Sequence, residues 1–207
     1  MSRWVIVGGA HIKDYDIVRR YILPEDRFCY CDSGLLHLEA LGFPADLVVG
    51  DFDSHPVPDL PAETIRLPRE KDDTDTVYAV GEAMRRGADA FLLIGVSGQR
   101  LDHTLGNLSL LLWLDTQNIP AMLLDDYGEM EIVSRQGAFV TDDFAWFSLI
   151  NISGTARGID VKNAKFPLKN AEITCDYQYG ISNEVIPGQT AAVTVAEGRL
   201  LLIRIRD

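Results

Sequence analysis

The stretch DLVVGDFDS, Asp46 to Ser54, predicts a buried strand that ends at an acidic edge. The apolar residues 47–49 form a short β-branched run of the kind found inside a sheet, and a glycine ends it. If the extended geometry continues, Asp51 and Asp53 share one face and Phe52 takes the other. Two like charges held side by side call for a cation, a cluster of donors or protonation. A strand-end turn with Asp-Ser capping is the alternative reading.

Apolar runs of this kind alternate with amphipathic stretches from Arg3 to about Asp126. The expected strands are WVIVGG (4–9), RFCYCD (27–32), DLVVGD (46–51), DAFLLIGV (89–96) and PAMLLDD (120–126). The expected helices are DYDIVRRYI (14–22), SGLLHLEALG (33–42), 74–86 and 101–117. This alternation predicts an α/β fold, with a mostly parallel sheet covered by helices on both faces.

The remainder of the chain is rich in short β-type segments without long helices. The expected strands are EMEIVS (129–134), GAFVTD (137–142), FAWFSLINI (144–152), AEITCDYQ (171–178), AAVTVA (191–196) and RLLLIRIR (199–206). The turn residues 196–198 suggest a hairpin between the last two strands. Alternation with period two predicts a C-terminal all-β sandwich or barrel. The sequence therefore predicts two domains, residues 1–128 and 129–207.

Composition limits the classes of partner and the compartment. The 207 residues carry 47% hydrophobic and 24% charged side chains, as in an ordinary globular protein, with a net charge of −12. This charge argues against nucleic-acid and anionic-membrane partners, but allows a phosphorylated small molecule if cations mediate the contact. The three cysteines do not complete a zinc site, and no apolar run is long enough to span a membrane. We expect a cytoplasmic protein with reduced thiols.

Acidic residues follow several of the expected strands. Asp32 and Asp51 each come directly after a strand, and ligands of open α/β sheets bind beyond these carboxyl ends. The segment KDDTDTV (71–77) adds three aspartates around the start of a helix. Capping explains one or two of them, whereas three acids in four residues favour a nearby cation. Taken alone, Asp32 is equally consistent with an N-cap.

The loop GVSGQRLDH (95–103) carries groups that can contact an anion directly. Its glycines let backbone amides approach a ligand, and Arg100 can supply forked donors to phosphate oxygens. Asp102 as an N-cap and His103 as an ordinary first-turn residue remain open alternatives. The spacing matches neither a Walker A loop nor a dinucleotide-binding fingerprint.

The balance of charges expected at this site indicates a bound metal ion. A triphosphate brings roughly four negative charges and the four aspartates 32, 51, 53 and 75 about four more, against two positive charges from Lys71 and Arg100. Mg²⁺ accepts carboxylate, phosphate and water oxygens, usually with one or two carboxylates per ion. One or two Mg²⁺ ions are therefore expected.

The motifs CDSG, DLVVGDFDS, KDDTDT and GQRLDHTLGN, in this order, resemble the thiamine pyrophosphokinase family, and the later GISNE resembles its C-terminal domain. The resemblance covers essentially the whole chain. It implies a homodimer with active sites between subunits, in which pyrophosphate moves from ATP to the thiamine hydroxyl with the help of Mg²⁺. The products are thiamine diphosphate and AMP.

The resemblance also implies roles for individual residues. The metal ligands would be Asp32, Asp51, Asp53 and Asp75. The ATP-binding residues would be Asp32, Lys71, Arg100, Asp102 and His103. The catalytic residues would be Asp72, Asp75, Arg100 and Asp102, with Asp72 and Asp75 both open as the proton acceptor.

The thiamine side would be formed by Ser182 and Asn183, completed by the partner subunit. Some eukaryotic relatives stack thiamine on a C-terminal tryptophan, but the last tryptophan here is Trp146, which leaves Tyr177 and Tyr179 as substitutes. Two other functions explain less of the sequence. A D-x-D nucleotide-sugar transferase leaves the Lys71 segment and the Arg100 loop without roles, and a non-catalytic nucleotide or thiamine sensor hardly requires so many clustered acids.

Overall fold

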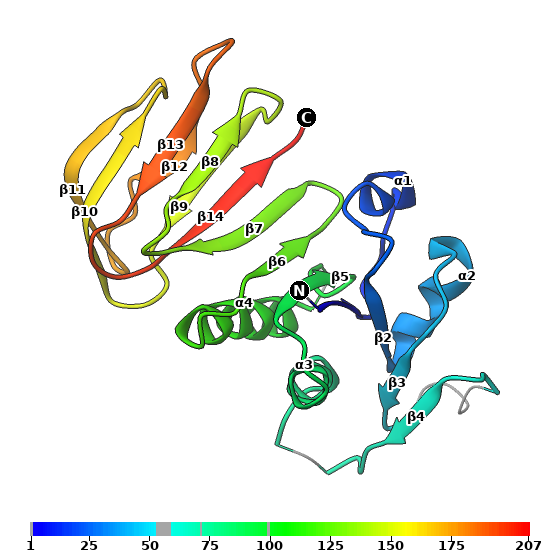
Figure 1. Cartoon of the computed structure of the whole chain (residues 1–207). Coiled ribbons are helices and arrows are strands. Elements are labelled where there is room, and N and C mark those ends of the chain that lie inside the picture. The colour runs from blue at the N-terminus through cyan, green and yellow to red at the C-terminus, as the bar shows by residue number, and fades with distance from the viewer. Residues whose placement is uncertain (1, 53–58, 71, 99) are drawn as a thin grey trace. The chain divides into compact units, whose positions relative to one another are not determined.

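The computed structural model describes residues 2–52, 59–70, 72–98 and 100–207. The chain forms two compact units, Met1–Asp126 and Tyr127–Asp207 (Figure 1). The first unit is built on a parallel sheet and the second on antiparallel sheets. Both parts of the predicted fold class are confirmed.

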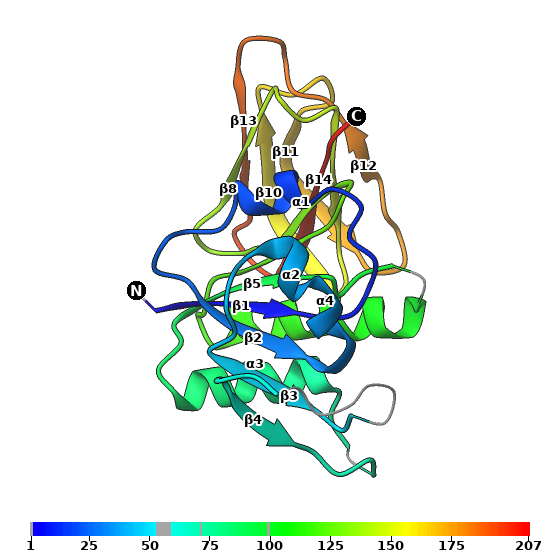
Figure 2. The same ribbon diagram turned by 90° about the vertical axis from the view of Figure 1, so that its right-hand side faces the viewer.

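The sheet of the first unit is entirely parallel. Its strands are β1 (Arg3–Val7), β2 (Arg27–Cys31), β3 (Leu47–Gly50), β4 (Glu63–Arg66), β5 (Ala90–Ile94) and β6 (Ala121–Leu124), in the order β6-β5-β1-β2-β3-β4. The arrowheads of β1 to β4 point the same way in Figure 2. The carboxyl ends of these strands therefore meet at one edge.

Helices cover both faces of this sheet (Figure 1). One face carries α1 (Tyr15–Arg19), the 3₁₀ helix η1 (Asp32–His37) and α2 (Leu38–Leu41); the other carries α3 (Asp75–Arg85) and α4 (Leu101–Thr116). Alternate strand residues, including Val5, Val7 and Tyr30, pack against α1 and α2. No helix in the described ranges is both long and apolar enough to cross a membrane.

The helical segment predicted over 33–42 forms, and Gly42 ends it as expected, but it is not one regular helix. The chain forms the 3₁₀ helix η1 and then a single α-helical turn, α2. A side chain at Gly34 would place its Cβ 2.1 Å from the carbonyl oxygen of Val7, so η1 packs directly on the end of β1. This close approach fixes the tight turn, and the helical pattern of apolar residues does not reveal it.

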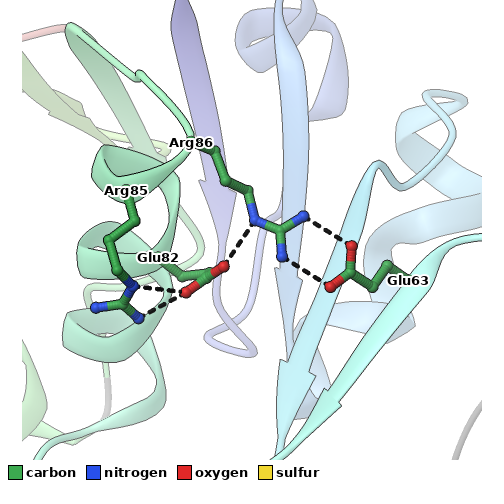
Figure 3. A network of polar contacts seen from close by, with 4 residues as sticks. All are labelled: Glu63, Glu82, Arg85 and Arg86. Atoms are coloured by element: carbon green, nitrogen blue, oxygen red, sulfur yellow. Dashed lines mark hydrogen bonds and ion pairs between the residues drawn. The ribbon is translucent and has the colours of Figure 1, made fainter.

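A charged network ties the edge strand β4 to the C-terminal end of α3 (Figure 3). The guanidinium of Arg86 donates two hydrogen bonds to Glu63, both of 2.8 Å, and a third of 2.8 Å to Glu82. Arg85 also binds Glu82. The arginines lower the pKa of both glutamates, chiefly by hydrogen bonding. Acids and bases alternate here, so each charge faces its opposite.

The second unit is a sandwich of two antiparallel sheets. Its strands are β7 (Gly128–Val133), β8 (Ala138–Thr141), β9 (Trp146–Ile150), β10 (Thr155–Lys162), β11 (Leu168–Thr174), β12 (Gly180–Asn183), β13 (Thr190–Thr194) and β14 (Leu200–Ile205). The sheet orders within this unit are β12-β9-β14-β7 and β11-β10-β13-β8. Side chains from both sheets, among them Phe147, Leu202, Ile159 and Val193, form its core.

The predicted hairpin at 196–198 was also wrong. Strands β13 and β14 lie in different sheets, so the turn joins the two sheets instead of pairing its neighbours. The amides of Ala196 and Glu197 both donate to the carbonyl of Arg157 in β10, at 3.1 Å. The turn residues were identified correctly, but turn chemistry does not determine which strands pair.

Candidate active site

The strand order changes direction between β1 and β5. The chain moves from β1 through β2 and β3 to β4, and then returns to place β5 on the other side of β1. At this point the Gly8 amide donates to the Ile94 carbonyl at 2.9 Å, and the Ala10 amide donates to the Gly95 carbonyl at 2.8 Å. A Cβ at Gly8 would lie 2.5 Å from the Gly95 oxygen, so this position requires glycine. Ligands of open α/β sheets bind at such a switch point.

Asp32 lies at this edge in an unusual backbone conformation. It follows β2 and begins η1 with a φ of 40°, in the left-handed region that Asp tolerates better than most residues. One of its carboxylate oxygens is buried. A Cβ at Gly50 would lie 3.0 Å from the Asp32 Cβ, so Asp32 packs against the residue that precedes Asp51. The structure thus brings the ends of β2 and β3 together.

Asp75 approaches the same place from α3. It is the first residue of that helix, directly after Thr74, whose hydroxyl accepts a hydrogen bond from the Val77 amide at 3.3 Å. The Cys31 thiol donates to the Asp75 carbonyl oxygen at 3.8 Å, which fixes the helix start against the end of β2. One Asp75 carboxylate oxygen is buried. An acid at a helix N-terminus is also favoured by the helix dipole.

Two acids lie within electrostatic range of the Cys31 thiol. The pKa of this buried thiol is raised by its hydrogen bond with Cys29 and by burial, and then further by the negative charges of Asp75 and Asp32. Both carboxylates therefore lie within electrostatic range of the same sulfur atom. Cys31 therefore lies near both acids, a contact that its place in an apolar strand did not predict.

The acidic segment after β3 departs from the expected geometry. β3 ends at Gly50, and Phe52 is buried with a φ of 54°, so the extended geometry does not continue through Phe52. Asp51 is half-buried at the end of β3, while Asp53 and Lys71 lie outside the described residues. Asp72 is exposed in the segment that precedes α3.

The described acids do not form a metal-binding cage by themselves. Within the residues that the structure describes, no three His, Cys, Asp or Glu side chains gather closely enough to hold a metal ion. The available donors near Cys31 are carboxylate oxygens, which suit a hard cation such as Mg²⁺. Mg²⁺ usually keeps several waters and takes only one or two carboxylates together with substrate phosphates. The donor set fits such a shared site.

The loop after β5 carries an exposed ion pair. Arg100 donates from Nε and a terminal nitrogen to the two Asp102 oxygens, at 3.0 and 2.7 Å, and the side chains are 70% and 64% exposed. This hydrogen bonding lowers the pKa of Asp102 and raises that of Arg100. The capping alternative for Asp102 was wrong, because α4 begins at Leu101 and its N-cap position is Arg100. His103 lies exposed in the first turn of α4.

Two residues that the sequence reasoning missed hold this loop in place. Thr104 accepts a hydrogen bond from the Gly98 amide at 3.1 Å. The buried Asn107 side chain donates to the Val96 carbonyl at 2.7 Å. Both lie on α4, where Thr104 is two residues and Asn107 five residues beyond Asp102. The signal in the sequence for Asn107 was a polar residue at a helix position whose spacing predicts burial.

The second unit contains a pocket of about 260 Å³ beside the predicted thiamine residues. Asn183 lines it together with Tyr179, and the other walls are mainly apolar: Leu149, Phe166, Leu168, Gly180 and Ile181. The Asn183 side chain accepts from the Phe166 amide at 3.0 Å and donates to its carbonyl at 2.8 Å. Asn183 therefore shapes the pocket wall.

Ser182 and Tyr177 lie next to residues that line this pocket. Ser182 is exposed with a φ of 57°, and its amide donates to the Ser148 hydroxyl at 3.0 Å. The rings of Tyr177 and Tyr179 contact each other with centroids 5.5 Å apart, and both are exposed. Strained backbone at an exposed serine is a feature often associated with ligand sites.

Comparison with known proteins gives consistent matches over both units. The family model "Thiamin pyrophosphokinase, catalytic domain" matches residues 18–123, and "Thiamin pyrophosphokinase, vitamin B1 binding domain" matches residues 131–200. The chain is 29% identical over 184 residues to thiamine pyrophosphokinase of Bacillus subtilis (strain 168), covering 85% of this chain and 82% of that protein.

Solved structures show the same likeness. The crystal structure of thiamine pyrophosphokinase from Bacillus subtilis matches with a TM-score of 0.86 and 26% identity, covering 100% of both chains. The crystal structure of thiamin pyrophosphokinase from Geobacillus thermodenitrificans matches with a TM-score of 0.83 and 29% identity, covering 99% of this chain and 98% of the other.

Proposed function

Because the chain belongs to the thiamin pyrophosphokinase family, we propose that it transfers the pyrophosphoryl group of ATP to the hydroxyl of thiamine. The enzyme class and the use of ATP follow from the family. The products are thiamine diphosphate and AMP. The residue assignments are supported by two observations: Asp32 packs against Gly50, the residue before Asp51, and Asp32 and Asp75 both lie within electrostatic range of the Cys31 thiol.

We assign metal binding to Asp32, Asp51 and Asp75, and also to Asp53, which follows Asp51 by two positions in the sequence. Bound there with the ATP phosphates, one or two Mg²⁺ ions would offset the negative charge of the polyphosphate and of the carboxylates. The protein supplies hard oxygen donors from different strand ends, and substrate and water supply the rest. Such a site needs only one or two protein ligands for each ion, and no three-ligand cluster is found among the described side chains.

Arg100, with Lys71, would bind the phosphate oxygens. The Arg100 fork that now holds Asp102 has the planar, bidentate geometry that also suits phosphate, and its exposure leaves it accessible to a ligand. Asp102 then serves to orient the guanidinium, and His103 extends the polar surface of the same loop. Thr104 and Asn107 keep the loop in a fixed position for this contact.

The transfer itself requires alignment more than new covalent chemistry. The thiamine hydroxyl oxygen forms a bond to the β-phosphorus, the bond from that phosphorus to the α,β-bridging oxygen breaks, and AMP leaves with that oxygen. The proton of the hydroxyl passes to an aspartate, for which Asp72 and Asp75 are both candidates. Positioning of the two reactants supplies much of the rate enhancement.

We propose that the predicted C-terminal domain, residues 129–207, binds thiamine and forms a homodimer, while residues 1–128 bind ATP and metal. The pocket near Asn183 offers an apolar wall and the exposed ring of Tyr179 for an aromatic cationic ligand. Ser182 would provide a polar contact at its rim. The buried free thiols of Cys29 and Cys31 suit a reducing compartment, so we assign the enzyme to the cytoplasm.

Product analysis tests this function. Purified protein is incubated with Mg²⁺, ATP and thiamine, and the phosphorus-containing products are separated. We expect AMP and thiamine diphosphate in equal amounts. Formation of ADP and thiamine monophosphate would contradict pyrophosphoryl transfer, and the absence of thiamine-dependent turnover would contradict the enzyme assignment. Light scattering of the same sample measures the mass, which should be that of two chains.

A further inference from the structure

A buried histidine, His37, joins the two backbone segments that form the switch-point edge. It ends η1, is 6% exposed, and uses both ring nitrogens. Nε2 lies 3.0 Å from the carbonyl oxygen of Ala10, and Nδ1 lies 2.8 Å from the Tyr15 hydroxyl. Because a carbonyl can only accept, Nε2 carries a proton, and in the neutral ring Nδ1 accepts from the Tyr15 hydroxyl. The neutral ring thus bridges Ala10 and Tyr15 as a single tautomer.

The peptide that His37 holds is in contact with the phosphate-binding loop. The Ala10 amide donates to the Gly95 carbonyl, so this residue is fixed at its amide by β5 and at its carbonyl by His37. A Cβ built at Gly98, within the loop that leads to Arg100, would lie 3.7 Å from the Ala10 side chain. Displacement of Ala10 would therefore be transmitted through its hydrogen bond to Gly95, the first residue of the segment that leads to Arg100.

The same histidine also fixes the turn that carries Asp32. Asp32 and His37 are the first and last residues of η1. Within this turn, Gly34 packs on the Val7 carbonyl, and a Cβ at Gly9 would clash with the Ser33 side chain. The first part of the turn is therefore packed tightly against β1, and His37 holds the last part to the Ala10 carbonyl.

We propose that His37 is a positioning residue of the active site, which acts through Ala10 and η1 to hold Asp32 and the Arg100 loop in register. This inference rests on the proposed function, because it assigns a catalytic consequence to that register. His37 does not itself contact the substrates in this account. Its effect is on the alignment of groups that do, where a shift of about 1 Å can cost on the order of 100-fold in rate.

Substitution of His37 tests the proposal. His37→Leu removes the donor to Ala10, whereas His37→Gln retains an amide N–H that can reach the same carbonyl. Tyr30→Phe is a matched control, because it removes another buried hydrogen bond from a ring to a backbone carbonyl, from the Tyr30 hydroxyl to Phe43 at 2.8 Å. For each variant we would measure Tm, KM for ATP, and kcat per folded molecule.

We expect His37→Leu to lose at least about tenfold in kcat at saturating ATP and thiamine. His37→Gln should recover most of that loss, and Tyr30→Phe should lower Tm without lowering kcat. Wild-type kcat in folded His37→Leu, or equal kcat losses in His37→Leu and Tyr30→Phe, would overturn the proposal. If His37→Leu does not fold, His37→Asn, which is too short to reach Ala10 from the same backbone position, takes its place with the same expectations.

A second readout separates this inference from the proposed function. Hydrogen exchange of the peptide covering residues 8–14 reports the Ala10 amide without any assay of turnover. We expect faster exchange there in His37→Leu than in wild type, with unchanged exchange in Tyr30→Phe. Unchanged exchange in His37→Leu would overturn the positioning role. An inactive wild-type protein would instead contradict the proposed function. The exchange rates would still test whether His37 holds Ala10 in place.

Discussion

The two ends of α3 hold charge in opposite ways. At the C-terminal end, Arg86 lies between Glu63 and Glu82, and the charges alternate in sign (Figure 3). At the N-terminal end, Asp75 lies near Asp32, and both negative charges act on the Cys31 thiol. One helix therefore carries a neutralised network at one end and a concentration of like charge at the other.

This difference separates a stabilising role from a functional one. Alternating charges on a surface satisfy one another and contribute modestly to stability. Like charges gathered at the carboxyl edge of a parallel sheet oppose folding, and proteins retain such features where a ligand makes use of them. The comparison predicts that neutralising an acid has opposite consequences at the two ends.

The largest effect is expected from Asp75→Asn, with Glu82→Gln on the same helix as its control. Asp75→Asn should lower kcat/KM by on the order of 100-fold or more, because a metal-binding charge is lost while the shape is kept. Its Tm should stay the same or rise, since like-charge repulsion is relieved. Glu82→Gln should keep full activity. These variants are compared by steady-state kinetics and thermal unfolding.

If Asp75→Asn lost as much stability as activity, the distinction between a functional and a stabilising end of α3 would be contradicted. Asp75 would then be a structural carboxylate, equivalent in role to Glu82. Asp51→Asn provides an independent check at the end of β3, and it should follow Asp75→Asn in both kinetics and Tm.

A smaller effect is expected in the exposed pair of the Arg100 loop. Arg100→Lys keeps the charge but loses the planar fork, so KM for ATP should rise about tenfold. Asp102→Asn weakens the hold on the guanidinium without removing it, and its effect on kcat/KM should be smaller. Initial rates over a range of ATP concentrations measure both. A larger loss in Asp102→Asn than in Arg100→Lys would show that this carboxylate acts directly in transfer.

The smallest effect concerns stability against pH. Burial lowers the pKa of His37 below its ordinary value of 6.5, so as pH falls below about 6.5 the unfolded chain binds a proton that the folded chain does not. Stability should fall in that range, and His37→Gln should remove this part of the slope. The pKa of Glu82 is lowered from 4.5 by its hydrogen bonds with Arg86 and Arg85. The stability that these ion pairs contribute is therefore fully present above pH 4.5 and is lost on further acidification.

Tm measured in buffers from pH 4 to pH 8 would resolve these two ranges. The wild type should lose stability in both, His37→Gln in the lower range only, and Glu82→Gln mainly in the upper range. A His37→Gln curve parallel to that of the wild type between pH 6.5 and 5.5 would contradict a neutral buried His37.

The sequence predicted the parts of this structure that depend on local patterns. Period-two and helical patterns located α3, α4 and the apolar strands, because burial of one face dictates the pattern. Strands with few apolar residues, such as β4, β10 and β12, gave no such signal. The pairing error at 196–198 arose because turn residues specify a change of direction and not a partner strand.

The candidate site was predictable in residue type but not in arrangement. Acids after strand ends pointed to Asp32 and Asp51, since all parallel strands end at one edge. The contacts that position them are between residues distant in the sequence: His37 reaches Ala10 across 27 positions, and Cys31 reaches Asp75 across 44. Packing in three dimensions creates these pairs, and no local spacing encodes them.

The most direct test is the position of Mn²⁺ in crystals grown with Mn²⁺, a non-hydrolysable ATP analogue and a thiamine analogue. We expect an anomalous peak at about 2.2 Å from a carboxylate oxygen of Asp32, Asp51, Asp53 or Asp75, shared with a phosphate oxygen. A nucleotide bound with its phosphates away from these aspartates, or Mn²⁺ bound elsewhere, would contradict the account.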